Sequence, residues 1–283
     1  MRRQIKVARF VGFCSGVTIA VRKTEKLLKE KKIYCIGELI HNTFVIQRLK
    51  KLGLIVVKNC RLIPAGSSVI IRAHGLPLET IEHLRKKNCE IFDFTCPILK
   101  KIHASIEKFK KEKFSIIIIG TPDHAEVKAL LSRAGKSAAV IRSVSSAALV
   151  KKSRKAAVIG QSTIDGETFE RLSGEILKKN KDALVFDTIC NEVKVRRKEA
   201  IGLAKKSKMV IIVGDRKSSN TKNLAKIVKN ICPVIIVTGE NELLRKKIIY
   251  PVGVTSGASS PRELVLEIVK KIKKARLRKQ SRA

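Results

Sequence analysis

The chain has 283 residues, of which 44% are hydrophobic, so it is long enough and apolar enough to form a folded globular protein. No apolar run reaches the ~18 residues that a membrane-spanning helix needs. The N-terminus begins with basic residues, but Arg9 interrupts the apolar stretch that follows and no small-residue cleavage site is in place. We therefore expect a cytoplasmic protein without a membrane anchor, in which residues 5–13 form a first strand.

The net charge of +37, from 61 Lys and Arg against 24 Asp and Glu, raises the possibility of a nucleic-acid partner. These basic residues are spread along nearly every expected helix, and only nine Phe and two Tyr accompany them, in no RNA-binding aromatic motif. We interpret most of the charge as solvated surface, with the basic C-terminal tail at residues 270–283 as the exception. A nucleic-acid-binding protein with incidental cysteines remains an alternative.

Three of the seven cysteines lie where an expected strand gives way to a helix, in the stretches GFCSGV (Cys14), FDFTCP (Cys96) and FDTICN (Cys190). The second and third stretches repeat one unit: an apolar strand, Phe-Asp, two residues, Cys and an amphipathic helix. Helix N-termini lower the pKa of thiols, so we expect three thiolates suited to a soft metal centre.

The odd number of cysteines argues against a disulfide framework, and the sequence has no CxxC motif typical of zinc ribbons. The four remaining cysteines follow no such pattern. We interpret them as small buried thiols: Cys35, Cys60, Cys89 and Cys232.

Strands and helices alternate along the chain with short connections, which predicts an α/β fold with largely parallel sheets. Two expected strands, each ending in a small polar loop, follow each cysteine; with their loops they span residues 34–42, 69–75, 116–126, 156–163, 210–220 and 252–260. In parallel sheets, ligands bind beyond the carboxyl ends of strands, where the next helix presents free N–H groups. The six polar loops and the three cysteine stretches make nine strand ends. All nine can face one cavity only if the three units pack around a common axis.

The polar loops supply the side chains of an anion site. Imidazole, hydroxyl and amide donors suit a diphosphate, and Glu126 adds one carboxylate. Each feature alone also has a structural explanation, because Ser and Asn cap helices and a carboxylate in the first turn stabilises the helix dipole. Their concurrence at corresponding strand ends favours a site. The candidate binding residues are His41, His74, His124, Gln161, Ser162, Thr163, Ser218, Ser219, Asn220 and Ser259.

Nine ordered motifs, GFCSGV, LIHN, AHG, DFTCP, HAEV, QST, TIC, KSSN and GVTSGAS, cover nearly the whole chain. In this order they resemble the LytB family of 4-hydroxy-3-methylbut-2-enyl diphosphate reductases. The resemblance implies three α/β domains in a pseudo-threefold trefoil around a central iron–sulfur site. It also implies one 4Fe-4S cluster per chain, with a fourth iron open to the substrate and three thiolate ligands from Cys14, Cys96 and Cys190.

On this basis we place the first domain at residues 14–96 and the second at 97–190. The third combines residues 1–13 with 191–283, which include the basic C-terminal tail.

The resemblance further implies that the diphosphate is held by His41, His74, His124, Ser218, Ser219, Asn220 and Ser259. Gln161 and Thr163 would lie close by, and Glu126 would deliver protons with Ser162 in its relay. The implied reaction is reductive dehydroxylation of (E)-4-hydroxy-3-methylbut-2-enyl diphosphate to isopentenyl and dimethylallyl diphosphates. This is the last step of the methylerythritol phosphate route to isoprenoids, and its external one-electron donor would be of the ferredoxin or flavodoxin type.

The chain departs from the family's common motifs at several positions. Arg72 precedes Ala73-His74 where the family has Ser, Thr121 replaces His, Ala125 replaces Pro, and Glu192-Val193 replaces an Ala-Thr pair. None of these removes a proposed ligand, so we expect them to affect the surroundings of the site and its rate. Another three-cysteine 4Fe-4S enzyme of similar build, such as quinolinate synthase, is the second alternative, although its dicarboxylate chemistry would not require this His, Ser and Asn set.

Overall fold

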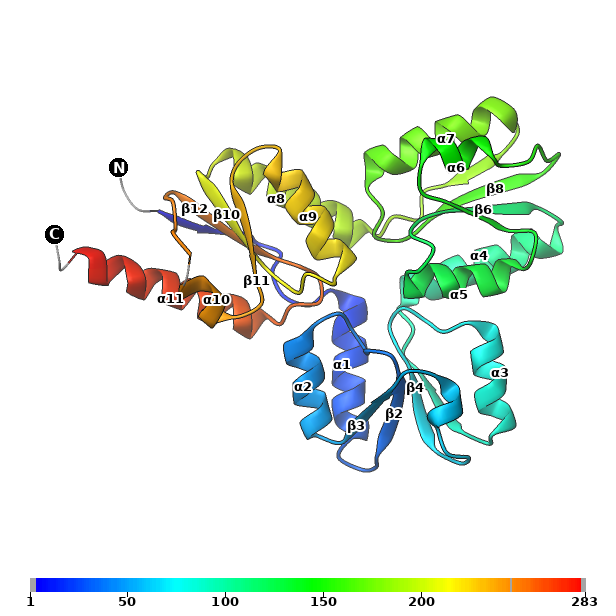
Figure 1. The fold of residues 1–283 in the computed structure, drawn as a ribbon, viewed down its shortest axis with the longest axis horizontal. Coiled ribbons are helices and arrows are strands. Elements are labelled where there is room, and N and C mark those ends of the chain that lie inside the picture. The colour runs from blue at the N-terminus through cyan, green and yellow to red at the C-terminus, as the bar shows by residue number, and fades with distance from the viewer. Residues whose placement is uncertain (1–3, 245, 281–283) are drawn as a thin grey trace. The chain divides into compact units, whose positions relative to one another are not determined.

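The computed structural model describes residues 4–244 and 246–280. Within them, twelve strands form three four-stranded sheets, all with parallel pairing, and helices connect the strands (Figure 1). The predicted α/β class with parallel sheets is confirmed. The chain divides into two compact units. The first unit comprises Met1–Thr18, Ile40–Arg48 and Asn191–Ala283, and the second comprises Ile19–Leu39 and Leu49–Cys190.

The first unit contains one sheet, in the order β1-β12-β10-β11. Its strands are β1 (Ile5–Val7), β10 (Met209–Val213), β11 (Val234–Val237) and β12 (Val252–Ser256). Its helices are α8 (Asn191–Lys205), α9 (Ser219–Lys229), α10 (Glu240–Leu244) and α11 (Arg262–Gln280). Successive residues of β10 enter two different cores, because side chains alternate along a strand. Both faces of this sheet are therefore covered.

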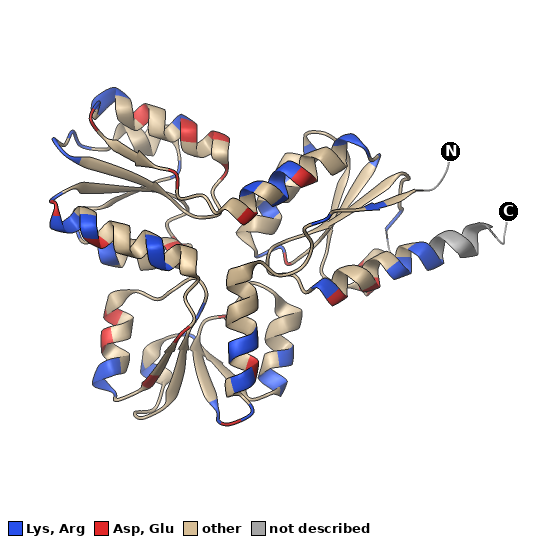
Figure 2. Cartoon of the chain, turned by 180° about the vertical axis from the view of Figure 1, so that it is seen from behind, with Lys and Arg blue, Asp and Glu red and all other residues tan. Residues whose placement is uncertain are grey.

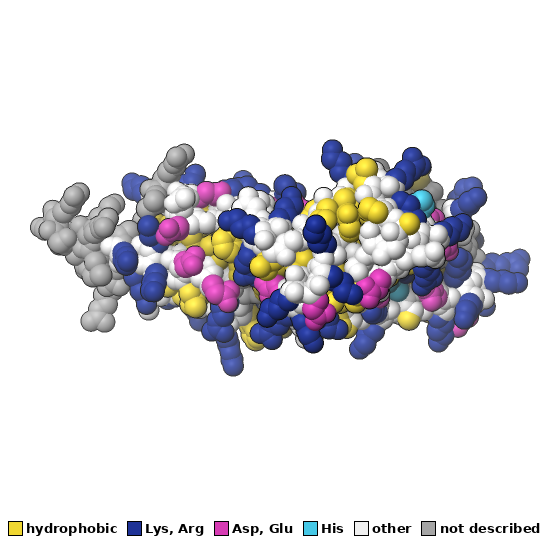
Figure 3. Space-filling model, turned by 90° about the horizontal axis from the view of Figure 1, so that it is seen from below, with side chains coloured by type: hydrophobic (Ala, Val, Ile, Leu, Met, Phe, Trp, Pro, Cys, Tyr) yellow, Lys and Arg dark blue, Asp and Glu magenta, His cyan; other side chains and the backbone are white. Residues whose placement is uncertain are grey.

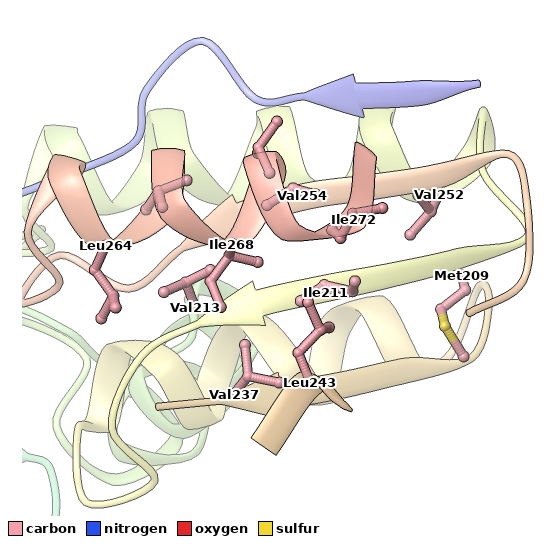
Figure 4. Close-up of a cluster of buried hydrophobic side chains, with 12 residues drawn as sticks. Met209, Ile211, Val213, Val237, Leu243, Val252, Val254, Leu264, Ile268 and Ile272 are labelled. Carbon is pink, nitrogen blue, oxygen red and sulfur yellow. The ribbon is translucent and has the colours of Figure 1, made fainter. Parts of the chain in front are cut away.

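Helix α11 covers one of these faces (Figure 4). Its buried side chains meet those of β10 and β12 and belong to Leu264, Val265, Ile268, Val269 and Ile272. The sequence predicted this buried side and a helix start near Pro261, and both are confirmed. The basic tail expected at residues 270–283 is not separate from this helix, because residues 270–280 continue α11. Residues 281–283 lie outside the described residues.

The second unit contains the other two sheets. The sheet in the order β3-β2-β4-β5 has strands β2 (Ile33–Ile36), β3 (Leu54–Val57), β4 (Ser68–Ile71) and β5 (Glu90–Asp93). The helical elements between Cys14 and β5 are α1 (Ser15–Leu27), α2 (Thr43–Lys51), the 3-10 helix η1 (Cys60–Leu62) and α3 (Leu78–Lys86). Helices α1 and α2 each contribute residues to both units.

The last sheet has the order β7-β6-β8-β9. Its strands are β6 (Ser115–Ile119), β7 (Ala139–Ile141), β8 (Ala156–Gly160) and β9 (Leu184–Phe186). Its helices are α4 (Pro97–Lys111), α5 (Ala125–Ala134), α6 (Val144–Ala148) and α7 (Gly166–Lys179). The run of four isoleucines in β6 alternates between two cores, so this sheet is also buried on both faces.

The three sheets share one topology. In each, an edge strand (β1, β5 or β9) leads to a cysteine stretch, and the next two strands lead to the polar loops of the candidate site. The strand at the other edge (β3, β7 or β11) leads to none of these residues. Nine of the twelve strands therefore carry candidate residues beyond their carboxyl ends.

One predicted strand is wrong in length. Residues 5–13 were expected to form a strand, but β1 ends at Val7. Beyond Ala8 the backbone N–H groups of Arg9 and Phe10 bond to the Glu199 carboxylate, and Gly12 has a φ of 99°. Since a side chain now takes the place of a neighbouring strand as hydrogen-bond partner, regular pairing stops.

The basic residues lie along helices throughout the chain (Figure 2). Figure 3 shows Lys and Arg side chains scattered over the visible face, with acidic and hydrophobic side chains between them. In the described portion, no helix has both the length and the apolar character needed to cross a membrane.

Candidate functional site

The three predicted cysteine ligands lie at the starts of helices. Cys96 is the N-cap of α4, while Cys14 and Cys190 directly precede α1 and α8. The sulfur of Cys14 accepts a hydrogen bond from the backbone N–H of Val17 at 3.5 Å. All seven cysteines lie in the described part of the chain and carry thiols rather than disulfides. Helix N–H groups thus point towards the sulfurs of Cys14 and Cys96, and Cys190 occupies the corresponding position before α8.

Cys96 and Cys190 belong to the second unit and interact electrostatically. Burial raises the pKa of the Cys96 thiol, and the backbone N–H groups of Ile98 and Leu99 only partly oppose this effect. The charge of Cys190 raises the Cys96 pKa further. The predicted lowering of the Cys96 pKa is therefore wrong, because burial outweighs the effect of the helix terminus.

The backbone connects these two cysteines to the polar loops of the same unit. The N–H of Cys96 donates to the carbonyl oxygen of Ala73 at 3.0 Å, and that of Cys190 donates to Ser162 at 2.9 Å. The chemistry of the donors fits an iron–sulfur cluster, since thiolates are its usual ligands and N–H groups near sulfur stabilise their charge.

The other four cysteines differ in burial. Cys35 is fully buried, as predicted, and burial raises the pKa of its thiol to about 12. Cys60, Cys89 and Cys232 are only half-buried, so the prediction of buried thiols is wrong for them. Cys60 begins the 3-10 helix η1, and Cys89 and Cys232 follow the turns that end α3 and α9, so packing covers only part of each side chain.

Glu126 lies in the first turn of α5, but its carboxylate bonds elsewhere. It is 2% exposed and accepts hydrogen bonds from the Ser162 N–H at 2.5 Å and the Ser162 Oγ at 2.9 Å. Burial raises its pKa to about 6, although both bonds from Ser162 act in the opposite direction. A carboxyl group that keeps its proton close to neutral pH is suited to general acid catalysis.

His74 and His124 lie together in the second unit. Their rings meet edge to face with centroids 5.6 Å apart, and a ring nitrogen of each lies within 4.8 Å of the other. Gly75 has a φ of 76°, and a Cβ there would lie 3.2 Å from the buried ring of His103. Glycine at this position therefore lets the loop turn directly after His74.

His124 and Gln161 also fix local backbone. The His124 Nδ1 accepts the N–H of Glu126 at 3.2 Å and so caps α5. The buried Gln161 accepts from the N–H of Thr121 at 3.1 Å and donates to the Thr163 Oγ1 at 3.0 Å. The polar loops after β6 and β8 are consequently held to each other.

The remaining predicted residues lie in the first unit. Ser259 donates its hydroxyl to the carbonyl oxygen of His41 at 3.0 Å. Ser218 caps α9 by accepting from the N–H of Thr221, and Ser219 begins that helix. Asn220 is 4% exposed, and neither its Oδ1 nor its Nδ2 has a hydrogen-bond partner among the described residues. An orphaned buried amide at a helix start indicates a polar ligand there.

The sequence interpretation missed Asp215, the second residue after β10. Its Oδ2 accepts from Thr43, at 3.1 Å from the backbone N–H and 2.7 Å from Oγ1, and its Oδ1 accepts from the N–H of Lys217. These hydrogen bonds lower the Asp215 pKa although burial opposes them. Asp215 therefore joins the loop after His41 to the loop that leads to Ser218. The signal available in the sequence was an acidic residue two positions beyond a strand of apolar residues.

The sequence shows Glu192 as a departure from the family motifs but does not predict its contact. Glu192 accepts hydrogen bonds from both the backbone N–H and the hydroxyl of Ser15, the residue after Cys14. It therefore caps the start of α1.

These observations define an α/β protein with three parallel sheets of one topology. Thiols lie beyond three edge strands, and imidazole, hydroxyl and amide groups lie beyond the neighbouring strands. The family described as "LytB protein" matches residues 5–273. The chain belongs to this family.

Two curated relatives are named 4-hydroxy-3-methylbut-2-enyl diphosphate reductase. The protein from Campylobacter hominis is 37% identical over 276 residues, covering 95% of this chain and 98% of the relative. The protein from Kosmotoga olearia is 37% identical over 283 residues, covering 95% of each chain.

Two solved structures are similar in fold. The E-1-hydroxy-2-methyl-but-2-enyl-4-diphosphate reductase from Plasmodium falciparum aligns with a TM-score of 0.89 at 24% identity, covering 95% of this chain and 88% of that one. A structure described as (E)-4-hydroxy-3-methyl-but-2-enyl diphosphate reductase, the terminal enzyme of the non-mevalonate pathway, aligns with a TM-score of 0.73 at 30% identity. It covers 96% of this chain and 100% of that one.

Proposed function

We propose that this chain is an oxidoreductase that converts (E)-4-hydroxy-3-methylbut-2-enyl diphosphate to isopentenyl and dimethylallyl diphosphates. The substrate takes up two electrons and two protons, its allylic C–O bond breaks, and water leaves. The observation that carries this proposal is the threefold repeat of a thiol beyond an edge strand with polar loops beyond the next two strands. Membership of the LytB family favours this reaction over a quinolinate synthase-like enzyme or a nucleic-acid-binding protein.

The proposed cofactor is one 4Fe-4S cluster with Cys14, Cys96 and Cys190 as ligands. Such a cluster would supply electrons one at a time and a Lewis-acidic iron for the departing oxygen. The chain supports it with helix N–H groups directed at two of the three sulfurs.

The proposed diphosphate ligands are the imidazole, hydroxyl and amide groups of the polar loops. They are His41, His74, His124, Ser218, Ser219, Asn220 and Ser259, with Gln161 and Thr163 holding the loops. Each hydrogen bond to a charged oxygen contributes about 1.5–3 kcal/mol. Because the diphosphate is remote from the reacting carbon, its binding orients the alcohol without taking part in the chemistry.

Glu126 is the proposed proton source. Its burial keeps the carboxyl group protonated at higher pH than an exposed glutamate, and Ser162 fixes the direction of both oxygens. In this role the carboxyl group protonates the departing hydroxyl, and the Ser162 hydroxyl carries a replacement proton.

Each sheet would form the centre of one domain, at residues 14–96, 97–190, and 1–13 with 191–283, arranged around the cluster. We also propose a cytoplasmic enzyme that receives electrons from a ferredoxin or flavodoxin, in agreement with a thiol-rich site that needs a reducing compartment.

Oxidation of a reduced viologen dye tests the proposal. Under anaerobic conditions, the iron-loaded protein should consume two equivalents of dye for each equivalent of the allylic diphosphate. The Cys96→Ser variant should consume the dye no faster than buffer. Dye consumption that does not depend on the diphosphate would contradict the proposed function.

A further inference from the structure

The backbone of residues 9–12, which leads to Cys14, is held by two charged side chains of α8. The Glu199 carboxylate accepts from the N–H groups of Arg9 and Phe10, the latter at 2.9 Å. Arg196 is 4% exposed and donates to the carbonyl oxygens of Phe10 and Gly12, each at 2.9 Å. These charge-assisted bonds make an irregular segment rigid.

This rigid backbone presents an aromatic ring to solvent. Phe10 is 48% exposed, and the guanidinium carbon of Arg9 lies 5.9 Å from its ring centroid. A second exposed arginine, Arg262, adjoins the segment, because a Cβ on Gly12 would lie 3.0 Å from the Arg262 Cβ. We call Arg9, Phe10 and Arg262 the Phe10 platform. Aromatic and arginine side chains are the residue types that protein interfaces concentrate, and a rigid aromatic loses little entropy on binding.

The Phe10 platform is close to a proposed cluster ligand along the chain. Phe10 precedes Cys14 by four residues, and four residues span at most ~14 Å even when fully extended. A protein bound to the platform would thus lie near the cluster, as electron transfer requires.

The charge of the chain indicates the kind of partner. A net charge of +37, with two arginines on the platform, attracts an acidic protein and speeds its encounter. A single aromatic ring does not offer the series of stacking surfaces that single-stranded nucleic acids use.

We propose that the Phe10 platform is the docking surface for a small acidic one-electron carrier protein. This inference rests on the proposed function. In each encounter the reduced carrier gives up one electron and leaves oxidised, and two encounters supply the electrons for one turnover.

The test compares two platform variants with two matched controls. Phe10→Ala and Arg9→Gln change only the side chains. The hydrogen bonds between the backbone of residues 9 and 10 and α8 remain possible. Leu149→Ala and Arg154→Gln make corresponding changes at exposed positions in the second unit. The probe is an acidic [2Fe-2S] ferredoxin, with its Kd measured by calorimetry at low and high salt. Turnover is measured with the reduced ferredoxin and, separately, with the viologen dye.

Both platform variants should weaken ferredoxin binding at least about fivefold at low salt and slow ferredoxin-driven turnover at subsaturating ferredoxin to a similar extent. Viologen-driven turnover should stay within about twofold of wild type, since the small dye needs no docking surface, and both controls should bind ferredoxin as wild type does. High salt should weaken wild-type binding.

Unchanged ferredoxin affinity in Phe10→Ala and Arg9→Gln would overturn the proposal, and so would an equal loss in the two controls. Equal losses of ferredoxin-driven and viologen-driven turnover without a change in Kd would show that these residues act on the chemistry or on folding. If wild type has no viologen-driven turnover, the proposed function fails, while the Kd values still decide whether the platform binds the carrier.

Discussion

The Glu126 carboxylate and the backbone and hydroxyl of Ser162 form a pair that joins the start of α5 to the loop after β8. A first-turn glutamate that only stabilised its helix would direct its charge at the free N–H groups of α5. Glu126 is instead buried and bonded to another strand end. This geometry supports the proposal that Glu126 is the proton source.

Glu126→Gln should lower the turnover number by about 10²–10⁴-fold, because the amide keeps the shape of the side chain but has no acidic proton. Iron content and the affinity for the diphosphate should stay close to wild type. The matched control is Glu79→Gln, which removes a first-turn carboxylate from α3. Turnover of Glu126→Gln within threefold of wild type, with iron content intact, would return Glu126 to a structural role.

The pH dependence of stability gives an independent test of the buried carboxyl group. Its pKa of about 6 in the folded protein exceeds the ordinary value of 4.5, so the folded state holds this proton more tightly than the unfolded state. The resulting stabilisation is complete below pH 4.5 and is lost as the pH rises through 6. The free energy of unfolding of wild type relative to Glu126→Gln should therefore fall by about 2 kcal/mol over this range. Urea titrations of the metal-free proteins under reducing conditions measure it, and a difference that is constant with pH would show an ordinary pKa.

Each proposed cluster ligand can be tested by serine substitution. Cys14→Ser, Cys96→Ser and Cys190→Ser should lose the visible iron–sulfur absorption or retain it only briefly, because a hard oxygen ligand replaces thiolate poorly. Cys232→Ser is the matched control, since this thiol is half-buried and has no proposed role. Loss of absorption in Cys232→Ser together with its survival in Cys190→Ser would refute the ligand assignment.

Much of this site could be predicted because its residues lie directly beyond strands with clear apolar patterns. The run of isoleucines in β6 and the valines and isoleucines of β10 identify buried parallel strands, and the polar residues after them follow from chain order. Asp215 could not be recognised as a link between loops, because its partner Thr43 is 172 positions away. The early end of β1 has a similar cause, because Glu199 is also distant in sequence.

Asp215→Ala should raise the KM for the diphosphate by about 10–100-fold, because hydrogen bonds to a charged group contribute about 1.5–3 kcal/mol and position the loops of His41 and Ser218. The turnover number and iron content should change less. Asp165→Ala is the control: it removes an aspartate that caps α7 and should lower stability without a change in KM. Equal increases in KM in both variants would indicate a general loss of structure.

Truncation after Lys274 tests whether the basic end of α11 takes part in the chemistry. Among the side chains of α11 that the structure describes, the last buried one is Ile272, and the cut retains it. Turnover and iron content should stay close to wild type, while salt-sensitive binding to heparin should weaken. A large fall in turnover per cluster would show that the removed residues contribute to the site.

Product analysis after anaerobic turnover in D₂O tests the central claim most directly. The iron-loaded protein, the allylic diphosphate and a chemical reductant should give isopentenyl and dimethylallyl diphosphates, each with one deuterium bound to carbon, since one of the two protons is delivered to carbon and the other leaves in water. Mass spectrometry measures both products and the isotope. Recovery of unchanged substrate from protein with a full complement of iron, or a product that retains the hydroxyl oxygen, would contradict the assignment of this chain as the reductase.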